Sequence, residues 1–303
     1  MSRVTVRVPG TTANCGPGFD AIGIACSLYN EIEVSLLPGG EPAITIVGQG
    51  CSQIPCDSRN IAFQAALQVL ERVGWHQQTI RMKLTNHIPL ARGLGSSAAA
   101  IVGGLVAANE ATGGTLSRQQ LLDMATAMEG HPDNVAPALF GGICLSVMHP
   151  AGTQCLSFPP PADLQLVVAV PDFTLSTKVS RQVLPKAVSM RDAVFNISRT
   201  GLLVAALARG ELSFLPFALE DRIHQPYRQK LIPGLPEVFA AARENGALGV
   251  TISGAGPALM AYTAGNAKAI GQAMVTAFRR QNKGAVYHVL SVNTEGAKII
   301  RSE

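Results

Sequence analysis

One glycine-rich turn constrains this chain more than any other segment. It runs Pro89-Leu-Ala-Arg-Gly-Leu-Gly-Ser-Ser-Ala-Ala99 and leads into small residues typical of a helix over 96–111. Such a turn leaves backbone N–H groups pointing one way at the positive end of a helix dipole, where phosphate groups bind. We therefore expect this segment to hold the triphosphate of ATP. The predicted contacts are Pro89, Leu90, Ala91, Arg92, Gly93, Leu94, Gly95, Ser96, Ser97, Ala98 and Ala99.

Two common phosphate-binding loops do not fit this segment. No lysine follows the glycines, as a P-loop requires. A dinucleotide-binding fingerprint requires a third glycine, but Ala98 stands at that position. It also follows directly after a strand, whereas Pro89 separates this turn from the preceding predicted strand. On its own, the segment also fits a tight turn followed by a serine-capped helix with no ligand.

Composition limits the classes of protein to consider. The chain has 303 residues, 47% of them hydrophobic and 15% charged, which excludes a disordered protein. Apolar runs such as Leu202–Ala208 are too short for a membrane span. The start of the chain alternates like a strand and lacks a signal-peptide core, so we expect a cytoplasmic protein. The net charge of +4 is mild and the arginines are dispersed, which disfavours nucleic-acid binding. Six cysteines without a C-x-x-C pair predict free thiols.

Hydrophobic periodicity predicts an α+β fold rather than a regular βαβ array. Pro159–Pro161 is the clearest break in composition, so we expect one lobe over 1–160 and a second over 161–303. Strands are predicted at 3–8, 29–36, 43–47, 79–85, 143–147, 164–170, 249–253, 258–262 and 286–292, and helices at 59–73, 96–111, 117–129, 176–184, 190–209, 234–245 and 266–281.

Three segments, in this order, resemble the motifs of the GHMP kinase superfamily, which includes galactokinase, homoserine kinase and mevalonate kinase. They are Pro9–Asp20, Pro89–Ala99 and Ser253–Pro257. Within the superfamily the chain is most similar to the homoserine kinase family, because its first motif ends in Asn-Cys-Gly-Pro-Gly-Phe-Asp and its middle carries Glu129-Gly-His-Pro-Asp-Asn134. The resemblance implies the two-lobed α+β GHMP fold, with ATP on the glycine-rich turn and L-homoserine between the lobes. It also allows a homodimer.

L-Homoserine is a zwitterion with a primary hydroxyl, and the resemblance implies partners for each of its groups. Asp20 is expected to bind the ammonium, and Arg181 and Arg228 the carboxylate. Arg222 is an alternative to Arg228 as the second arginine that binds the carboxylate. The structural alternative for Asn14 and Asp20 is that they only stabilise a bend as Asx-turn residues. The full predicted acceptor set is Asn14, Asp20, His131, Thr177, Arg181, Arg228 and Gly254.

Two further predictions concern the chemistry. Ser97 and Glu129 are candidate ligands for Mg²⁺, which prefers hard oxygen donors, although Glu129 also fits a surface helix residue. Asn134 stands where related kinases are taken to have an aspartate base, and an amide cannot accept a proton. We therefore expect Asn14 and Asn134 to orient the hydroxyl, the γ-phosphate to take its proton, and His131 to be structural.

Alternatives remain at this stage. Another GHMP kinase could act on L-threonine, mevalonate or an isoprenoid alcohol, although mevalonate has no ammonium for Asp20 to bind. A catalytically silent protein of the same fold could sense an amino acid. The predicted magnesium ligands disfavour it.

Overall fold

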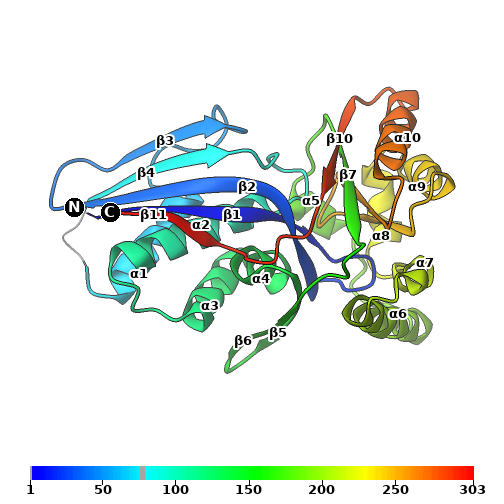
Figure 1. The fold of residues 1–303 in the computed structure, drawn as a ribbon, viewed down its shortest axis with the longest axis horizontal. Helices are drawn as coiled ribbons and strands as arrows, with labels where there is room; N and C mark the ends of the chain where they lie inside the picture. Colours follow the sequence, from blue (N-terminus) through cyan, green and yellow to red (C-terminus); the bar gives the residue numbers. More distant parts are fainter. Residues whose placement is uncertain (1, 76–78) are drawn as a thin grey trace.

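The α+β prediction is confirmed by a computed structural model that describes residues 2–75 and 79–303 (Figure 1). Its strands form a seven-stranded and a four-stranded sheet. The larger sheet holds β1 (Ser2–Ala13), β2 (Ile22–Leu37), β3 (Ala43–Gly48), β4 (Thr79–Asn86), β5 (Ile143–His149), β6 (Gly152–Phe158) and β11 (Lys298–Ser302). The smaller holds β7 (Gln165–Pro171), β8 (Gly249–Ile252), β9 (Leu259–Thr263) and β10 (Ala285–Leu290).

The larger sheet is built around the long pair β1 and β2. These strands run antiparallel from Ser2 opposite Leu36 to Ala13 opposite Gly23, with one irregularity between Pro9 and Gly10. β2 is long enough to pair with β4 along one part and with β5 along another. The end of β1 therefore projects toward the smaller sheet, and it carries the first motif with it (Figure 1).

Helix α2 (Ser96–Ala111) is made of small residues because it lies buried between the larger sheet and α1 (Ile61–Arg72). A Cβ on Gly103 would come 2.4 Å from Ile32, and a Cβ on Gly104 would come 2.3 Å from the carbonyl oxygen of Ala62. Larger side chains would therefore force α2 away from both neighbours. This packing fixes the start of α2, which begins directly after the glycine-rich turn.

Two more helices complete this layer. α3 (Arg118–Glu129) begins at Ser117 with a capping box, in which Ser117 and Gln120 each bind the other's backbone N–H. It ends at Glu129 with Gly130 as its cap residue, and after one more residue α4 (Pro132–Phe140) begins. The short connection lets both α3 and α4 contact α2, and it puts Glu129 at the end of α3 within hydrogen-bond distance of Ser97 at the start of α2.

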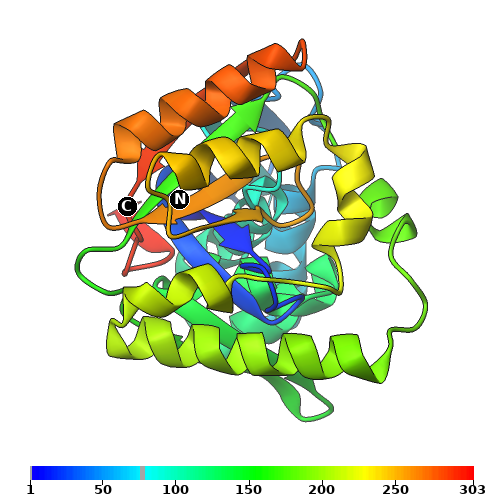
Figure 2. The same ribbon diagram turned by 90° about the vertical axis from the view of Figure 1, so that its right-hand side faces the viewer.

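Helices cover both faces of the smaller sheet. α9 (Leu235–Glu244) and α10 (Ala267–Arg280) pack on one face in a core of their own. The opposite face joins the main core, which also contains buried residues of α6 (Met190–Arg209) and α7 (Leu215–Ala218). Figure 2 shows α6 and α7 side by side, and the remaining short helices are α5 (Thr177–Gln182), α8 (Gln225–Arg228), η1 (Leu212–Phe214) and η2 (Gln229–Leu231).

The structure corrects the sequence prediction in several places. Ser96 is not the cap of α2, because Gly95 takes that position in a left-handed conformation with no side-chain cap. Strands β6 and β11 and helix α4 were not predicted. β11 pairs with β1, so the end of the chain lies in the larger sheet. The division into lobes at residue 160 stays a prediction. β11 comes from the second predicted lobe but pairs in the larger sheet, whose other strands come from the first. All six cysteines are free, as expected.

Candidate functional site

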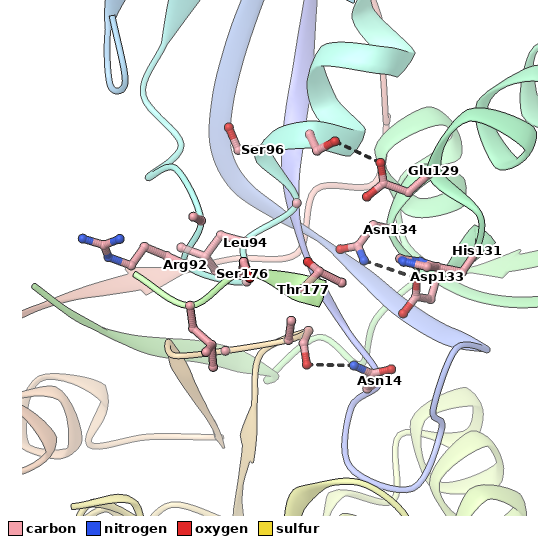
Figure 3. Close-up of a pocket in the computed structure, with 18 of the residues that line it drawn as sticks. Asn14, Arg92, Leu94, Ser96, Glu129, His131, Asp133, Asn134, Ser176 and Thr177 are labelled. Atoms are coloured by element: carbon pink, nitrogen blue, oxygen red, sulfur yellow. Dashed lines mark hydrogen bonds and ion pairs between the residues drawn. The ribbon is translucent and has the colours of Figure 1, made fainter. Parts of the chain in front are cut away.

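The three motifs meet around one cavity of about 310 Å³. The glycine-rich turn and the start of α2 line one end, and residues of the first motif, α4 and α5 line the other (Figure 3). Every predicted site residue lines this cavity except Ala98 and Ala99, which are fully buried. The side chains of these two alanines pack in the core, so only their backbone can contribute to a ligand site.

The glycines of the turn are required by close packing. A Cβ on Gly93 would lie 2.1 Å from the carbonyl oxygen of Ser253, and a Cβ on Gly95 would lie 2.0 Å from Oγ1 of Thr11. Both glycines also have positive φ, of 78° and 69°. The turn is therefore held against β1 and the third motif at once. The first turn of α2, which has no side-chain cap, faces the cavity.

Unusual backbone conformations gather in the same loops. Among the described residues, six that are not glycine have positive φ, and four of them lie in the first motif or the glycine-rich turn. Each costs on the order of 1 kcal/mol or more, and such residues cluster at functional sites. They are Asn14 (69°), Cys15 (45°), Asp20 (56°) and Ala91 (52°).

The carbonyl oxygen of Gly254 connects three segments. Nδ2 of Asn14 donates to it at 2.8 Å, and Nη1 of Arg228 donates at 2.9 Å. Oδ1 of Asn14 in turn accepts from the backbone N–H of Asp20 at 3.0 Å. Asn14 therefore holds the first motif to the third and fixes the turn that carries Asp20.

Asp20 and Arg181 form a two-point ion pair in the structure. Nη2 of Arg181 lies 2.6 Å from Oδ1 of Asp20, and Nη1 lies 3.0 Å from Oδ2. Burial lowers the pKa of Arg181, but its hydrogen bonds and the charge of Asp20 outweigh this and raise the pKa above its usual value. About a third of each side chain stays exposed, so both remain accessible from the cavity. The sequence placed these two residues in one site but did not predict their contact.

Arg228 lies at the bottom of the site, with 1% of its surface exposed. Its Nε donates to the carbonyl oxygen of Ser180, and Nη1 lies 3.2 Å from Nδ1 of His224. Burial, followed by the charge of Arg181, lowers the pKa of Arg228 to about 10, so it is still charged at neutral pH. Arg222 lies outside the cavity, 3.5 Å from Asp192.

His224 was missed by sequence reasoning. It is fully buried, and burial lowers its pKa, so it is neutral and carries one ring proton. Nε2 donates to the carbonyl oxygen of Gly16 at 2.7 Å, which leaves Nδ1 to accept from Arg228. The ring also stacks on Phe19. His224 therefore positions Arg228 against the first motif. Its place two residues before Pro226 in the sequence gave no signal for this role.

Ser97 and Glu129 meet at the nucleotide end of the cavity. The Ser97 hydroxyl donates to Oε2 of Glu129 at 3.0 Å (Figure 3). Burial raises the pKa of Glu129, and the hydrogen bond from Ser97 only partly offsets it. A partly buried carboxylate beside a hydroxyl offers the hard oxygens that Mg²⁺ prefers, so the two residues fit a magnesium site.

A second group of ligand-type side chains lies at the acceptor end. Ligand atoms of Asp20, His131 and Asp133 lie within 4.8 Å of one another. Asp20 is already paired with Arg181, and Nδ1 of His131 lies 2.6 Å from Oδ1 of Asp133. A cation here would have to compete with the guanidinium, so we assign no metal to this group.

Asp133 is the second residue that sequence reasoning missed. It is 2% exposed at the start of α4 and accepts from Nδ2 of Asn134 at 3.2 Å as well as from His131. Oδ1 of Asn134 accepts from the Thr11 hydroxyl at 2.7 Å. Burial lowers the pKa of His131, but the hydrogen bond and the charge of Asp133 outweigh it and raise the pKa above 6.5. Asp133 thus fixes both neighbours at the cavity wall (Figure 3).

Comparison with known proteins agrees with this geometry. The chain matches the family model of the GHMP kinases N terminal domain over residues 60–142 and that of the GHMP kinases C terminal over residues 203–280. It is 47% identical to a homoserine kinase of Moorella thermoacetica, over 97% of this chain and 99% of that one. The chain belongs to the homoserine kinase family. A homoserine kinase of Trichormus variabilis is 45% identical over 98% of this chain and 99% of its own.

A solved structure extends the family likeness to the fold. The crystal structure of homoserine kinase from Cytophaga hutchinsonii superposes with a TM-score of 0.91 at 35% identity, covering 98% of this chain and 97% of that one. The two-lobed GHMP kinase architecture expected from the motifs is therefore confirmed for this family member. No helix of residues 2–75 and 79–303 is long and apolar enough to cross a membrane.

Proposed function

We propose that this chain transfers the γ-phosphoryl group of ATP to the side-chain hydroxyl of L-homoserine, giving O-phospho-L-homoserine and ADP, a step in threonine biosynthesis. One observation carries the proposal. A single cavity is lined at one end by the start of α2, the kind of helix N-terminus that binds phosphate, and at the other by an aspartate and two arginines. The membership of the homoserine kinase family supports the same reaction.

The nucleotide end of the cavity is suited to the triphosphate. Backbone N–H groups at the start of α2 face it, and the helix dipole adds to their attraction for anions. Ser97 and Glu129 would hold Mg²⁺, which when bound neutralises phosphate charge. The loop 89–95 and Leu175 would enclose the rest of the nucleotide.

The acceptor end is suited to a zwitterion. The ammonium would bind Asp20, and the carboxylate would bind Arg181 and Arg228. Because Asp20 and Arg181 already pair with each other, the substrate must exchange one ion pair for two. Arg228 lies rigidly in the wall, while the partly exposed Arg181 can turn toward the carboxylate. Thr177 lies one helical turn before Arg181 on the same face and borders this pocket.

Transfer needs an aligned nucleophile more than a strong base. The hydroxyl oxygen of homoserine forms a bond to the γ-phosphorus, the bond to the β–γ bridging oxygen breaks, and the hydroxyl proton passes to the transferred phosphoryl group. Asn14 and Asn134 would orient the hydroxyl, and each already has its carbonyl oxygen fixed by another residue of the site. The residues of 1–160 and 161–303 would then act as the two lobes that enclose the reactants.

His131 is expected to contribute little to the chemical step. It is paired with Asp133, and although burial lowers its pKa, this pairing raises the pKa overall, which reduces the share of imidazole free to accept a proton. Replacing His131 with alanine should lower kcat less than tenfold, because a general base typically contributes at least about a hundredfold. A loss of a hundredfold or more in folded protein, with KM unchanged for both substrates, would contradict the proton path above.

Glu129 is expected to govern the dependence on magnesium. The change Glu129→Gln keeps the shape of the side chain but removes its charge, so the Mg²⁺ concentration giving half-maximal rate should rise about tenfold or more. Glu110→Gln, on α2 and outside the cavity, is the matched control and should match wild type. Equal magnesium curves for all three proteins would remove Glu129 from the site.

A substrate panel tests the proposed acceptor. ADP release is followed with Mg-ATP and L-homoserine, D-homoserine, L-threonine or mevalonate. We expect strong turnover with L-homoserine alone, since Asp20 and the arginines match its ammonium and carboxylate. If L-threonine or mevalonate were the preferred substrate, the protein would still be a kinase of this fold, but the assignment of L-homoserine as the acceptor would be wrong. Silence with all four in folded protein would favour an amino-acid-binding protein without this activity.

A further inference from the structure

Arg92 is the only charged residue of the glycine-rich turn Pro89–Ala99. A guanidinium beside a phosphate site is normally expected to bind phosphate. In the structure its side chain points away from the other labelled residues of the cavity (Figure 3). Nε donates to the carbonyl oxygen of Pro171 at 2.9 Å, Nη2 to that of Asp172 at 3.0 Å and Nη1 to that of Leu90 at 3.2 Å. The side chain of Arg92 therefore ties the turn to the end of β7.

The backbone that Arg92 contacts at the end of β7 is itself fixed. The N–H of Asp172 donates to the carbonyl oxygen of Gly284 at 2.9 Å, and Oδ2 of Asp172 accepts from the N–H of Gly284 at 3.2 Å. Arg92 is half-buried, and burial lowers its pKa, which the charge of Asp172 only partly offsets. Because unpairing buried donors costs free energy, a guanidinium bonded to fixed carbonyl oxygens has little freedom to turn toward a ligand.

A second hydrogen bond links the same two segments. The backbone N–H of Leu175 donates to the carbonyl oxygen of Ala91 at 3.2 Å. Ala91 has a positive φ of 52°, so its conformation depends on the contacts that hold it. Leu175 lies two residues before Thr177, the first residue of α5. The turn is therefore bonded at Ala91 and at Arg92 to the segment 171–175, which leads directly into α5.

Helix α5 is held mainly by polar contacts. Of its six residues, only Ser180 is buried. The Ser180 hydroxyl donates to the carbonyl oxygen of Ala255 at 2.8 Å, and its own carbonyl oxygen accepts from Nε of Arg228 at 3.3 Å. Arg181 is paired with Asp20. Segments with few buried apolar contacts are easily displaced, so the position of Arg181 depends on the segments to which α5 is bonded.

We infer that Arg92 is a positioning residue that links the two ends of the cavity, so that ATP and L-homoserine each strengthen the binding of the other. A nucleotide on the turn fixes Ala91 and Arg92. Their bonds to the segment 171–175 then hold the start of α5, and α5 holds Arg181 beside the acceptor. A ligand that orders a segment lowers the cost of ordering it for the second ligand, and the effect is reciprocal. The identity of the two ligands rests on the proposed function.

Calorimetry of the full chain tests the link. L-Homoserine is titrated into the protein alone and into protein saturated with Mg²⁺ and β,γ-imido-ATP, which does not transfer its phosphoryl group. We expect the nucleotide to tighten homoserine binding about tenfold in wild type. Arg92→Lys keeps the positive charge, but one ammonium cannot reproduce the guanidinium's bonds to several carbonyl oxygens, so the factor should fall below about twofold. If Arg92 bound phosphate instead, the variant would bind the nucleotide more weakly and keep the tenfold factor.

Arg118 provides the matched control. Its guanidinium also bonds to two backbone carbonyl oxygens, those of Leu139 at 3.3 Å and Ala297 at 3.2 Å, but it lies outside the cavity. Arg118→Lys therefore removes the same kind of contact elsewhere in the fold and should keep the wild-type factor. Thermal unfolding of both variants shows that the proteins compared are folded.

Hydrogen exchange supplies a readout that needs no amino acid. In wild type, Mg²⁺ with β,γ-imido-ATP should slow amide exchange in peptides covering residues 172–182 about fivefold or more, and in Arg92→Lys it should not. Slowed exchange in a wild type that does not bind L-homoserine would reject the proposed acceptor and keep the link. Unchanged exchange in wild type, or equal slowing in Arg92→Lys, would overturn the inference. So would homoserine binding that is independent of nucleotide in wild type, a tenfold factor kept in Arg92→Lys, or an equal loss in Arg118→Lys.

Discussion

Replacing Asp20 with alanine should raise the KM for L-homoserine by about a hundredfold or more and leave the KM for ATP within about twofold. The change removes the carboxylate proposed to bind the substrate ammonium, and it leaves Arg181 without its ion-pair partner. Losing one partner of a buried, hydrogen-bonded charge pair costs about 2–5 kcal/mol, and about 1.4 kcal/mol corresponds to a factor of ten; the hundredfold effect is for the pair that bound substrate would cover. Initial rates with each substrate varied in turn measure the effect.

Asp192 provides the control for this change. It also lies close to an arginine, Arg222, but outside the cavity, so Asp192→Ala should leave both KM values near wild type. Thermal unfolding of each variant separates loss of binding from loss of the fold. An unchanged KM for homoserine in Asp20→Ala would remove Asp20 from the acceptor site.

The second large effect is expected at Arg228. Lysine keeps the charge but cannot replace the bonds from Arg228 to the Ser180 and Gly254 carbonyl oxygens, which hold the guanidinium in the wall of the site. Arg228→Lys should therefore raise the KM for L-homoserine about a hundredfold, with a smaller effect on the KM for ATP. Homoserine binding by calorimetry should weaken by a similar factor.

Arg222→Lys decides between the two arginines that the sequence could not separate. Arg222 lies over Phe195 and near Asp192, so its replacement should change homoserine affinity less than about twofold. The reverse result, with Arg222→Lys impaired and Arg228→Lys normal, would contradict the assignment made from the cavity.

Local signals made much of the fold predictable. Ser117, a residue type that favours the position before a helix, marked the start of α3, and the small residues after the glycine-rich turn marked α2. Helix α4 was not predicted because Pro137 lies inside it and proline normally interrupts a helix. The packing of its other residues keeps the segment helical. Strand β11 was not predicted because it is short and exposed. It pairs with β1, at the opposite end of the chain, and no local sequence pattern indicates that pairing.

The sequence predicted which residues line the site, but not which of them contact one another. The motifs named the residues that line the cavity, because glycine-rich turns and helix starts have recognisable sequences. The pairing of Asp20 with Arg181 joins residues far apart in the chain and depends on how the connection between β1 and β2 packs against α5. Asp133 and His224 hold other site residues through hydrogen bonds that are partly or fully buried, and the residue type alone does not indicate such a role. Contacts of this kind arise from tertiary packing.

Identifying the product tests the central claim most directly. Phosphorus NMR of the protein with Mg-ATP and L-homoserine distinguishes transfer to the alcohol from transfer to water, which ADP release alone does not. The account predicts a new phosphomonoester resonance, split by two methylene protons, that grows in step with ADP. Inorganic phosphate appearing in place of that resonance, or no reaction of L-homoserine in folded protein, would contradict it.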